Sequence, residues 1–414
     1  MENGVTDMRM LSENDKQWVE SCLGKVARKM ETVTKRNLDK IPYTTGKDGR
    51  FDDKSGKDIC WWTNGFWGGE MWQLYELTGD EMYKKEAVGV EDKLDANLMI
   101  TEGLDHDNGF KWLPTSVYRY KLFKNSESYN RAMLAASNMA GRFNIKGNFI
   151  RAWNNWDDVD RRGYAIIDCM MNLPLLYWAS NETTDPRFEM IARAHADTAM
   201  KAFVRDDGSV NHIVIFDPNT GEIVGKPGGQ GYGEGSSWTR GQSWGIYGFA
   251  LSYKYTGEKK YLDTSKKIAD YVMSAIPETY LIPIDYRQPA DCNLEDSTAA
   301  AITASGLIEL SEALRESAGS EKAEGAKDVG SLGRVKDVGS LGDAKDADKY
   351  LDCAIKLLRT LDEKRISWGD DTDNLLNNCA VDFHGDGHNM SIIYGDYYFI
   401  EALMKLEGKN PSVF

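Results

Sequence analysis

The chain has 414 residues, of which 41% are hydrophobic, and a formal net charge of −15. A chain of this length and composition can bury a large core, which argues against global disorder. The acidic balance argues against a nucleic-acid or anionic-membrane surface, because such surfaces need a basic face. Length alone allows either two or three domains or one large closed barrel.

The N-terminal residues show no basic segment followed by an apolar run, so no signal peptide is predicted. No stretch approaches the roughly 18 uninterrupted apolar residues of a membrane span. The six cysteines are scattered without a C-x-x-C pair, which is typical of reduced core residues. We therefore expect a cytoplasmic protein that binds neither nucleic acid nor membrane.

A weak internal repeat begins at residues 62–67, a loop rich in Gly and Trp that leads through an apolar segment to Thr78-Gly79. Residues 238–244 lead in the same way to Thr256-Gly257. Each helix is expected to end at its Thr-Gly, where glycine can cap the C-terminus. Helix hairpins repeated around one core describe an α/α toroid with functional loops on one rim. Coincidental helix-end chemistry is the alternative.

A polar cluster, Asp105-His-Asp-Asn-Gly-Phe110, leads into the next apolar segment. Its functional interpretation is a rim loop that presents His106 and Asp107 to the hydroxyl groups of a ligand. A solvated turn or a helix cap is the alternative.

Asp168 stands alone in an almost wholly apolar segment, residues 164–177. Asp is seldom buried without partners, because ionisation in a low dielectric raises its free energy or its pKa. A carboxyl group placed in this way can hold its proton near neutral pH, as a general acid must. A helix cap or a hydrogen-bonded core Asp would give the same pattern.

Helical periodicity dominates the rest of the chain. Apolar residues recur at steps of three and four in residues 187–204, 261–276 and 351–361. Alternation is clearest in residues 211–216, which end in the turn 217–221 and predict a short hairpin. The pattern predicts an all-α fold with few strands.

Residues 228–244 form a Gly-rich stretch that supplies an amide (Gln230), a cation (Arg240) and an aromatic face (Trp244). The glycine spacing matches neither a P-loop nor a dinucleotide-binding loop. Glycine permits close approach of the backbone to a ligand. In an acidic chain, Arg240 is a candidate carboxylate clamp, because its planar guanidinium can bind a carboxylate bidentately.

A near-exact nonapeptide tandem occupies residues 326–334 and 335–343. It is polar and Gly-rich and cannot bury much surface, so we expect a mobile insertion at about 319–346 between two helices. A duplicated loop without function is the simpler interpretation.

The five histidines do not form a metal set. His384 and His388 have helical spacing, but two glycines between them argue against a helix. No G-x-S-x-G elbow or Cys–His signature is present. We therefore expect no metal and no cofactor, and a nucleophilic hydrolase is disfavoured.

Twelve tryptophans add a different indication. Flat aromatic faces are the usual platforms for sugar rings, although cores also use tryptophan.

Five motifs together resemble one family. They are W-W-T-N-G-F-W at 61–67, H-D-x-G-F at 106–110, A-I-I-D-x-M-M-N-L-P at 165–174, Q-G-Y at 230–232 and W-x-R-G-Q-x-W at 238–244. From about residue 61 to residue 398, apart from the insertion, the chain resembles the unsaturated glucuronyl hydrolases of glycoside hydrolase family 88. The motifs around Asp168 and Arg240 are long and specific, and the other motifs are shorter.

The resemblance implies one (α/α)6-barrel catalytic domain over residues 1–414, with short hairpin loops on the active-site rim. It implies removal of the non-reducing-end Δ4,5-unsaturated glucuronic acid from lyase-generated oligosaccharides of the glycosaminoglycan type. Asp168 would be the general acid and base, and Asp107 with His106 would hold ring hydroxyls. The other implied substrate-binding residues are Trp61 and Trp153, which would stack on the sugar, His212 and Gln230, which would line the reacting site, and Arg240 and Trp244, which would hold the uronate or the neighbouring sugar.

This chemistry suits a single carboxyl group. The C4=C5 bond conjugated to the ring oxygen is a vinyl ether, so protonation at C4 gives an oxocarbenium-like cation at C5 that water captures. The resulting hemiketal opens and expels the attached sugar. One carboxyl can donate the first proton and accept one from water, unlike the two-carboxylate scheme of ordinary glycosidases.

One departure concerns sulfate. Members that prefer sulfated substrates resemble each other in a Ser-x-x-Ser-x-Lys run, whose positions here are His388, Ser391 and Ile393. Loss of the lysine predicts no strong preference for sulfated fragments.

Three alternatives stay open from the sequence. An unsaturated rhamnogalacturonyl hydrolase acting on pectin fragments would share the barrel and the catalytic logic. A non-catalytic sugar-binding protein or a sugar epimerase on an α/α toroid is also possible from the pattern. Binding alone needs aromatics and Arg, but not a lone carboxyl in an apolar segment. Asp168 therefore favours an enzyme.

Overall fold

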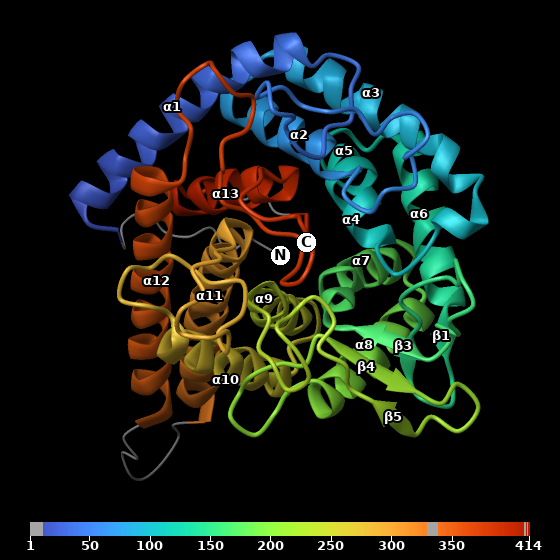
Figure 1. Cartoon of the computed structure of the whole chain (residues 1–414). Helices are drawn as coiled ribbons and strands as arrows, with labels where there is room; N and C mark the ends of the chain where they lie inside the picture. Colours follow the sequence, from blue (N-terminus) through green and yellow to red (C-terminus); the bar gives the residue numbers. More distant parts are fainter. Residues whose placement is uncertain (1–10, 329–337, 410, 412) are drawn as a thin grey trace.

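The computed structural model describes residues 11–328, 338–409, 411, 413 and 414, with side chains left out from 319 to 344. Helices alternate along the chain between an outer and an inner ring (Figure 1). The outer ring comprises α1 (Glu13–Arg36), α3 (Glu81–Leu98), α6 (Ser126–Gly141), α8 (Pro186–Ala202), α10 (Lys259–Ala275) and α12 (Val338–Lys364). The inner ring comprises α2 (Phe66–Thr78), α4 (Asn108–Trp112) with η3 (Leu113–Val117) and α5 (Tyr118–Phe123), α7 (Leu173–Thr183), α9 (Thr239–Thr256), α11 (Ser297–Asp328) and α13 (Ile393–Leu406). This order is the predicted (α/α)6 barrel.

The two rings differ in sequence because they differ in surroundings. Inner helix α13 is buried along its whole length, and α9 is buried from Thr239 to Ser252. Outer helix α10 buries one face only, with Tyr261, Ile268 and Val272 on that face. A helix packed on all sides is apolar all round, whereas a surface helix carries one apolar stripe. The periodicity that predicted α8, α10 and α12 is therefore the pattern of outer-ring helices, which bury one face only.

The predicted Thr-Gly helix ends are confirmed. Helix α2 ends at Thr78, with Gly79 in the left-handed conformation at φ 75°. Helix α9 ends at Thr256, with Gly257 at φ 69°. Each glycine N–H donates to a carbonyl four residues back, which closes the last turn. The internal repeat is therefore a true structural repeat of inner-ring helices.

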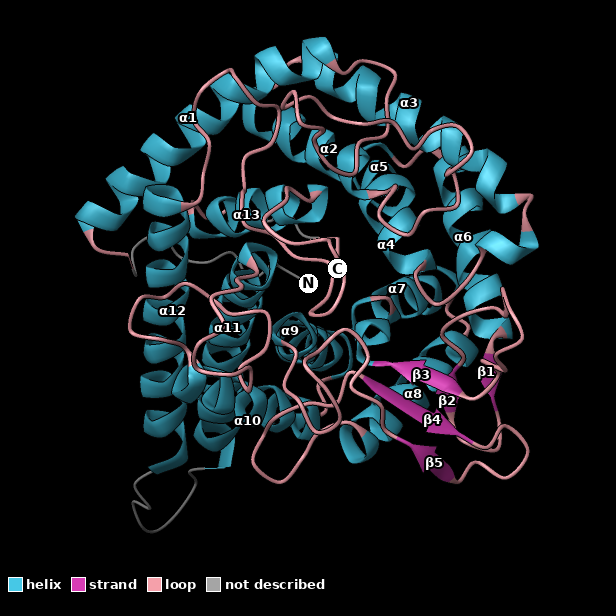
Figure 2. Ribbon diagram, viewed as in Figure 1, coloured by secondary structure: helices cyan, strands magenta, loops and turns pink. Residues whose placement is uncertain are grey.

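The strands gather at one side of the ring (Figure 2). Strands β3 (Tyr164–Ile166), β4 (Ile213–Phe216) and β5 (Ile223–Gly225) form one antiparallel sheet, and β1 (Phe143–Asn144) pairs with β2 (Phe149–Ile150). The predicted hairpin is therefore β4–β5. Strand β3 runs into the 3₁₀ turn η4 (Ile167–Met171), and the backbone N–H of Ile167 donates to the carbonyl of His212. The sheet thus brings Asp168 beside His212.

The insertion expected at 319–346 is partly helical in backbone. Helix α11 extends to Asp328 and helix α12 begins at Val338. The loop expectation is corrected for these stretches. Residues 329–337, which comprise the end of the first repeat and the start of the second, lie outside the described residues.

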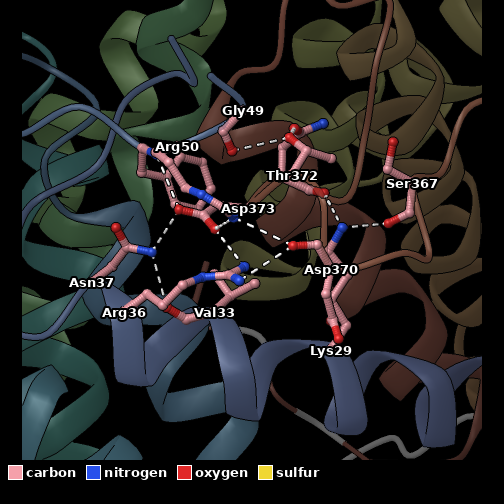
Figure 3. Close-up of polar contacts among 12 residues, drawn as sticks. Lys29, Val33, Arg36, Asn37, Gly49, Arg50, Ser367, Asp370, Thr372 and Asp373 are labelled. Atoms are coloured by element: carbon pink, nitrogen blue, oxygen red, sulfur yellow. Dashed lines mark hydrogen bonds and ion pairs between the residues drawn. The ribbon is translucent and has the colours of Figure 1, made fainter. Parts of the chain in front are cut away.

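A buried carboxylate ties α1 to the loop before α13 (Figure 3). Asp373 accepts hydrogen bonds from Arg36 at 2.7 Å, Arg50 at 3.0 Å and Asn37 at 2.9 Å. Lys29 of α1 donates to the backbone carbonyl of Asn374 at 2.6 Å. These contacts join the first helix of the barrel to a segment more than 300 residues later, so they help to close the ring.

All six cysteines are free, and four of them, Cys22, Cys169, Cys353 and Cys379, are buried, whereas Cys60 and Cys292 are half-buried. Across the described ranges, no helix combines the length and the apolar character that crossing a membrane requires.

Candidate active site

A cavity of about 240 Å³ opens on the rim that carries the loops leading into the inner helices. Its lining residues come from loops far apart in the sequence. They are Trp62, His106, Asp107, Trp153, Trp156, Ile166, Asp168, His212 and Gln230. Six of the nine predicted site residues are therefore brought together here, and Trp61, Arg240 and Trp244 are not part of the lining.

Asp168 lies on η4 with its side chain 16% exposed. Its Oδ1 has no hydrogen-bond partner in the protein. Burial raises the pKa of Asp168 to about 7, although the Arg240 cation acts in the opposite direction. A carboxyl with this pKa is substantially protonated at neutral pH and can act as a general acid there. The alternative of a helix-capping Asp is not what the geometry shows, because the side chain faces the cavity.

The proton of the His212 ring can be placed from its contacts. The His212 Nδ1 accepts the backbone N–H of Gln230 at 2.9 Å. Burial lowers the pKa of His212 to about 3, so the ring is neutral near pH 7. A neutral imidazole whose Nδ1 accepts must carry its proton on Nε2. That Nε2–H lies 3.8 Å from Oδ1 of Asp168, so a donor faces the acid.

Gly229 makes this contact possible. It adopts φ +60°, and a Cβ at this position would overlap the His212 ring nitrogen Nδ1. Glycine is therefore required both by the backbone conformation and by the close approach of the loop.

Asp107 stands at the start of α4, and its carboxyl lies near a second histidine. Its Oδ1 accepts from the Asn172 amide at 3.3 Å and lies 3.4 Å from Nε2 of His106. Burial raises the pKa of Asp107 well above its usual value, and the negative charges of Asp105 and Asp168 raise it further. Burial lowers the pKa of His106 to about 4, so this ring is also neutral near pH 7. Two carboxyls and two neutral imidazoles thus share one cavity.

Two tryptophans form an aromatic wall. Trp153 lies 5.6 Å from Trp156, centroid to centroid, in an edge-to-face arrangement. Trp156 is 64% exposed, and the Arg161 guanidinium lies 3.7 Å from the centre of its ring. An exposed indole with a cation on one face offers a rigid platform to a sugar ring.

Trp61 does not line the cavity, although its neighbour Trp62 does. Trp61 is 40% exposed and packs edge-on against Tyr43 at 5.5 Å. Trp62 packs against Phe110 and Tyr394. Adjacent residues of a turn point in different directions, and the motif alone does not show which indole faces inward.

The carboxylate clamp expected at Arg240 stays a prediction, and in the structure the guanidinium binds groups of the protein itself. Its side chain is 2% exposed, and it forms an ion pair with buried Asp296. It also donates to the backbone carbonyls of Ala380 and Val381, each at 2.6 Å. Arg240 lies in the first turn of inner helix α9, and Asp296 lies just before the start of α11. Arg240 therefore holds the 380–381 loop, whose Val381 carbonyl also accepts from the Gln230 side chain.

Trp244 is also displaced from its expected role. Its ring is fully buried and packs against Phe110 at 5.2 Å and Tyr398 at 5.6 Å. Its ring is therefore not exposed to the cavity for stacking. Its indole N–H favours the ionised form of Asp168 and so acts to lower the pKa of that carboxyl.

Sequence reasoning missed Trp62, Trp156 and Ile166 as lining residues, and it missed Asn172, whose amide binds Asp107. Trp62, Ile166 and Asn172 stand inside the quoted motifs, so a signal was present. Trp156 follows Trp153 by three residues in an irregular segment, where no periodicity indicates direction.

Comparison with known proteins identifies the same architecture. The chain is 32% identical over 383 residues to the unsaturated glucuronyl hydrolase of Bacillus sp. (strain GL1), covering 91% of this chain and 94% of the relative. A crystal structure of unsaturated glucuronyl hydrolase from Bacillus sp. GL1 superposes with a TM-score of 0.80 at 31% identity, covering 95% of this chain and 97% of that chain. The chain belongs to the unsaturated glucuronyl hydrolase family.

A third match shows a ligand in a family member. An unsaturated glucuronyl hydrolase mutant from Streptococcus agalactiae, complexed with dGlcA-GalNAc6S, superposes with a TM-score of 0.73 at 25% identity, covering 98% of this chain and 96% of that chain. No family model matches the chain. As a member of the unsaturated glucuronyl hydrolase family, the protein is a glycoside hydrolase with an (α/α)6 barrel.

The sulfate-related positions of this glucuronyl hydrolase family member lie at and just before the start of α13. Ile393 is 0% exposed at the start of α13, and its N–H donates to the Tyr43 carbonyl. Ser391 is held by Thr45, and His388 Nε2 lies 2.7 Å from the Asp382 carbonyl. The expectation that sulfated fragments are not strongly preferred stays a prediction.

Within the described part of the chain, no group of three or more His, Cys, Asp or Glu side chains is arranged to hold a metal ion.

Proposed function

We propose that this glycoside hydrolase releases the non-reducing-end Δ4,5-unsaturated glucuronic acid from lyase-generated disaccharides of the glycosaminoglycan type. The observation that carries the proposal is the Asp168 carboxyl, which faces the cavity, has no hydrogen-bond partner at Oδ1 and has its pKa raised to about 7 by burial. The relatives' names supply the substrate class, because one is an unsaturated glucuronyl hydrolase and another was complexed with dGlcA-GalNAc6S.

In the proposed reaction, Asp168 donates its proton to C4 of the unsaturated ring. The electron pair of the C4=C5 bond forms the new C4–H bond, and C5 becomes an oxocarbenium-like cation. Water adds to C5 and returns one proton to the Asp168 carboxylate. The hemiketal then opens and releases the downstream sugar as an alcohol, so the acid is regenerated within one turnover.

Neighbouring groups suit this sequence. The His212 Nε2–H can donate to the Asp168 carboxylate after the first proton transfer and stabilise its charge. Asp107 and His106 present an acceptor and a neutral ring for the sugar hydroxyls. Trp153 and Trp156 give the sugar an aromatic wall, and Gln230 lies beside His212.

The test is loss of absorbance at the lyase-product band on a panel of unsaturated disaccharides. The panel should include hyaluronan-, chondroitin- and heparin-derived disaccharides, with and without sulfate, and the rhamnogalacturonan-derived disaccharide. Turnover of the glucuronyl substrates supports the proposal. Exclusive turnover of the rhamnogalacturonan substrate would assign the pectin activity instead. Binding without any loss of absorbance would indicate a non-catalytic sugar-binding protein or an epimerase.

A further inference from the structure

Asn172 joins the two segments that carry the carboxyls of the site. It is fully buried and lies between η4 and α7. Its Nδ2 donates to Oδ1 of Asp107 at 3.3 Å and to the backbone carbonyl of Asp168 at 3.2 Å. Its Oδ1 accepts the backbone N–H of Phe110 at 2.7 Å. One side-chain amide therefore contacts both the loop of the acid and the first turn of α4.

The orientation of this amide follows from its partners. The Phe110 N–H is an obligatory donor, so the amide oxygen must face it. The Nδ2 group then faces two acceptors, the Asp107 carboxyl and the Asp168 carbonyl, and each of its hydrogens has a partner. A flipped amide would oppose donor to donor and oxygen to oxygen at all three contacts.

Gly109 lets the first turn of α4 rest directly on Asn172. A Cβ at position 109 would lie 2.6 Å from the Asn172 Cα and 2.5 Å from its Oδ1. Side chains do not tolerate such distances, so the α4 backbone and Asn172 form one packed unit. The position of Asp107, two residues before Gly109, is set by this packing.

The hydrogen bond from Asn172 also affects the charge of Asp107. Burial and the neighbouring Asp105 and Asp168 raise the pKa of Asp107, whereas the Asn172 amide lowers it. A donor to a carboxylate favours its ionised form. Without this donor, Asp107 would hold a proton more tightly and would be less able to accept a hydroxyl hydrogen bond.

We propose that Asn172 is a positioning residue, which holds Asp107 in a fixed orientation beside Asp168 and keeps it an acceptor for the substrate. Its kinetic consequence rests on the proposed function, because it assumes that Asp107 binds the substrate. Its effect on the ionisation of Asp107 does not depend on which substrate is cleaved.

The sharpest variant is Asn172→Asp, because it keeps the size and the acceptor for the Phe110 N–H while replacing both donors by a carboxylate that repels Asp107. We expect kcat/KM at about pH 7.5 to fall roughly tenfold to a hundredfold, the scale of a lost hydrogen bond to a charged group. At lower pH the introduced carboxyl gains a proton and can again donate to Asp107. The pH optimum should therefore move to more acidic values, which a purely structural defect would not produce.

A double-mutant cycle with Asp107→Asn shows whether Asn172 acts through Asp107. If it does, the double variant loses no more activity than Asp107→Asn alone. Losses that multiply would overturn the proposal. Should Asn172→Asp fail to fold, Asn172→Ser enters the same cycle, because the smaller side chain leaves room for water at the same partners.

Asn37 offers a matched control. Its Nδ2 also donates to a backbone carbonyl, that of Val33, and to a buried carboxylate, that of Asp373 (Figure 3). We expect Asn37→Asp to lower the melting temperature without moving the pH optimum. An equal shift of the optimum in both variants would mean that general loosening, not the contact with Asp107, explains the result.

A readout that needs no turnover separates this proposal from the proposed function. The 13C resonance of the Asp107 carboxyl, assigned by its loss in Asp107→Asn, reports its titration directly. We expect Asn172→Asp to raise the pKa of Asp107 by about one unit or more. An unchanged titration overturns the positioning role. Lack of wild-type turnover on every unsaturated substrate, with the titration shift present, overturns only the proposed function.

Discussion

At the residue scale, Asp168 combines burial with access to the cavity. Replacing it by Asn keeps its size and removes the proton. We expect Asp168→Asn to lower kcat by roughly 10²–10⁴-fold, the usual contribution of a general acid–base group. Substrate affinity, measured by equilibrium binding of an unsaturated disaccharide, should change little. A folded Asn variant within tenfold of the parent would remove Asp168 from the mechanism.

The same variant has a stability signature. The Asp168 pKa rises from 3.8 to about 7 on folding, so the folded state binds the proton more tightly than the unfolded chain. Stability therefore falls as pH rises from about 4 to about 7. Asp168→Asn removes this penalty, and its melting temperature at about pH 8 should equal or exceed that of the parent. A lower value there would point to a structural hydrogen bond at Asp168.

The pH dependence of activity follows from the same group. Asp168 must be protonated to donate to C4, and burial places its pKa at about 7. We expect log(kcat/KM) plotted against pH to fall with a slope approaching −1 above about pH 7. His106 and His212, with pKa values lowered to about 4 and about 3, should contribute no titration between about pH 5 and pH 9. A basic-limb pKa near 9 in the kcat/KM profile would contradict the assignment.

At the element scale, the loop before α9 sets the tautomer of His212. Gly229→Ala would place a methyl group against the ring nitrogen Nδ1 and would strain a residue at φ +60°. We expect kcat to fall at least tenfold through displacement of His212, with the barrel still folded by circular dichroism. Gly233→Ala is the control, because a Cβ there meets no atom within 4 Å. Equal kinetics for the two variants would show that the loop does not position the ring.

Arg240, in the first turn of α9, has a different environment from the one its motif indicated. Sequence pattern placed a cation in a Gly-rich loop and indicated a clamp for a carboxylate ligand. In the structure, Arg240 begins an inner helix, and its carboxylate partner is Asp296 of the protein itself. The partners of Arg240, Asp296 and the 380–381 loop, come from distant parts of the chain, and a single motif does not contain that information.

At the scale of the whole molecule, Asp373 helps to close the ring (Figure 3). Burial by itself raises its pKa, but hydrogen bonds from Asn37, Phe51 and Arg50 outweigh burial and lower it below 3.8. The stability from this carboxylate is therefore complete above about pH 4 and is lost as pH falls through the lowered value. We expect Asp373→Asn to reduce the free energy of unfolding at about pH 7 by on the order of 2 kcal/mol.

The difference between Asp373→Asn and the parent should shrink below about pH 4, where the parent carboxylate gains its proton. Urea unfolding at several pH values measures this difference. A difference that stays constant down to about pH 2 would show that packing, and not the charge, carries the effect.

The sequence by itself determined the helical barrel, the Gly-capped ends of α2 and α9, the β4–β5 hairpin and the candidacy of Asp168. Each of these depends on local rules: helix periodicity, the positive φ of Gly79 and Gly257, and a lone carboxyl among apolar neighbours. The motifs also indicated which loops meet at the rim.

Only the tertiary structure decided which of two adjacent indoles, Trp61 or Trp62, lines the cavity, and that Arg240 binds Asp296. The same holds for the tautomer of His212, set by the Gln230 N–H 18 residues later, and for the contact of Asn172 with Asp107, 65 residues earlier. The physical reason is that side-chain direction and hydrogen-bond partners arise when loops from separate hairpins pack on one rim. Local sequence rules act over a few residues and do not reach that far.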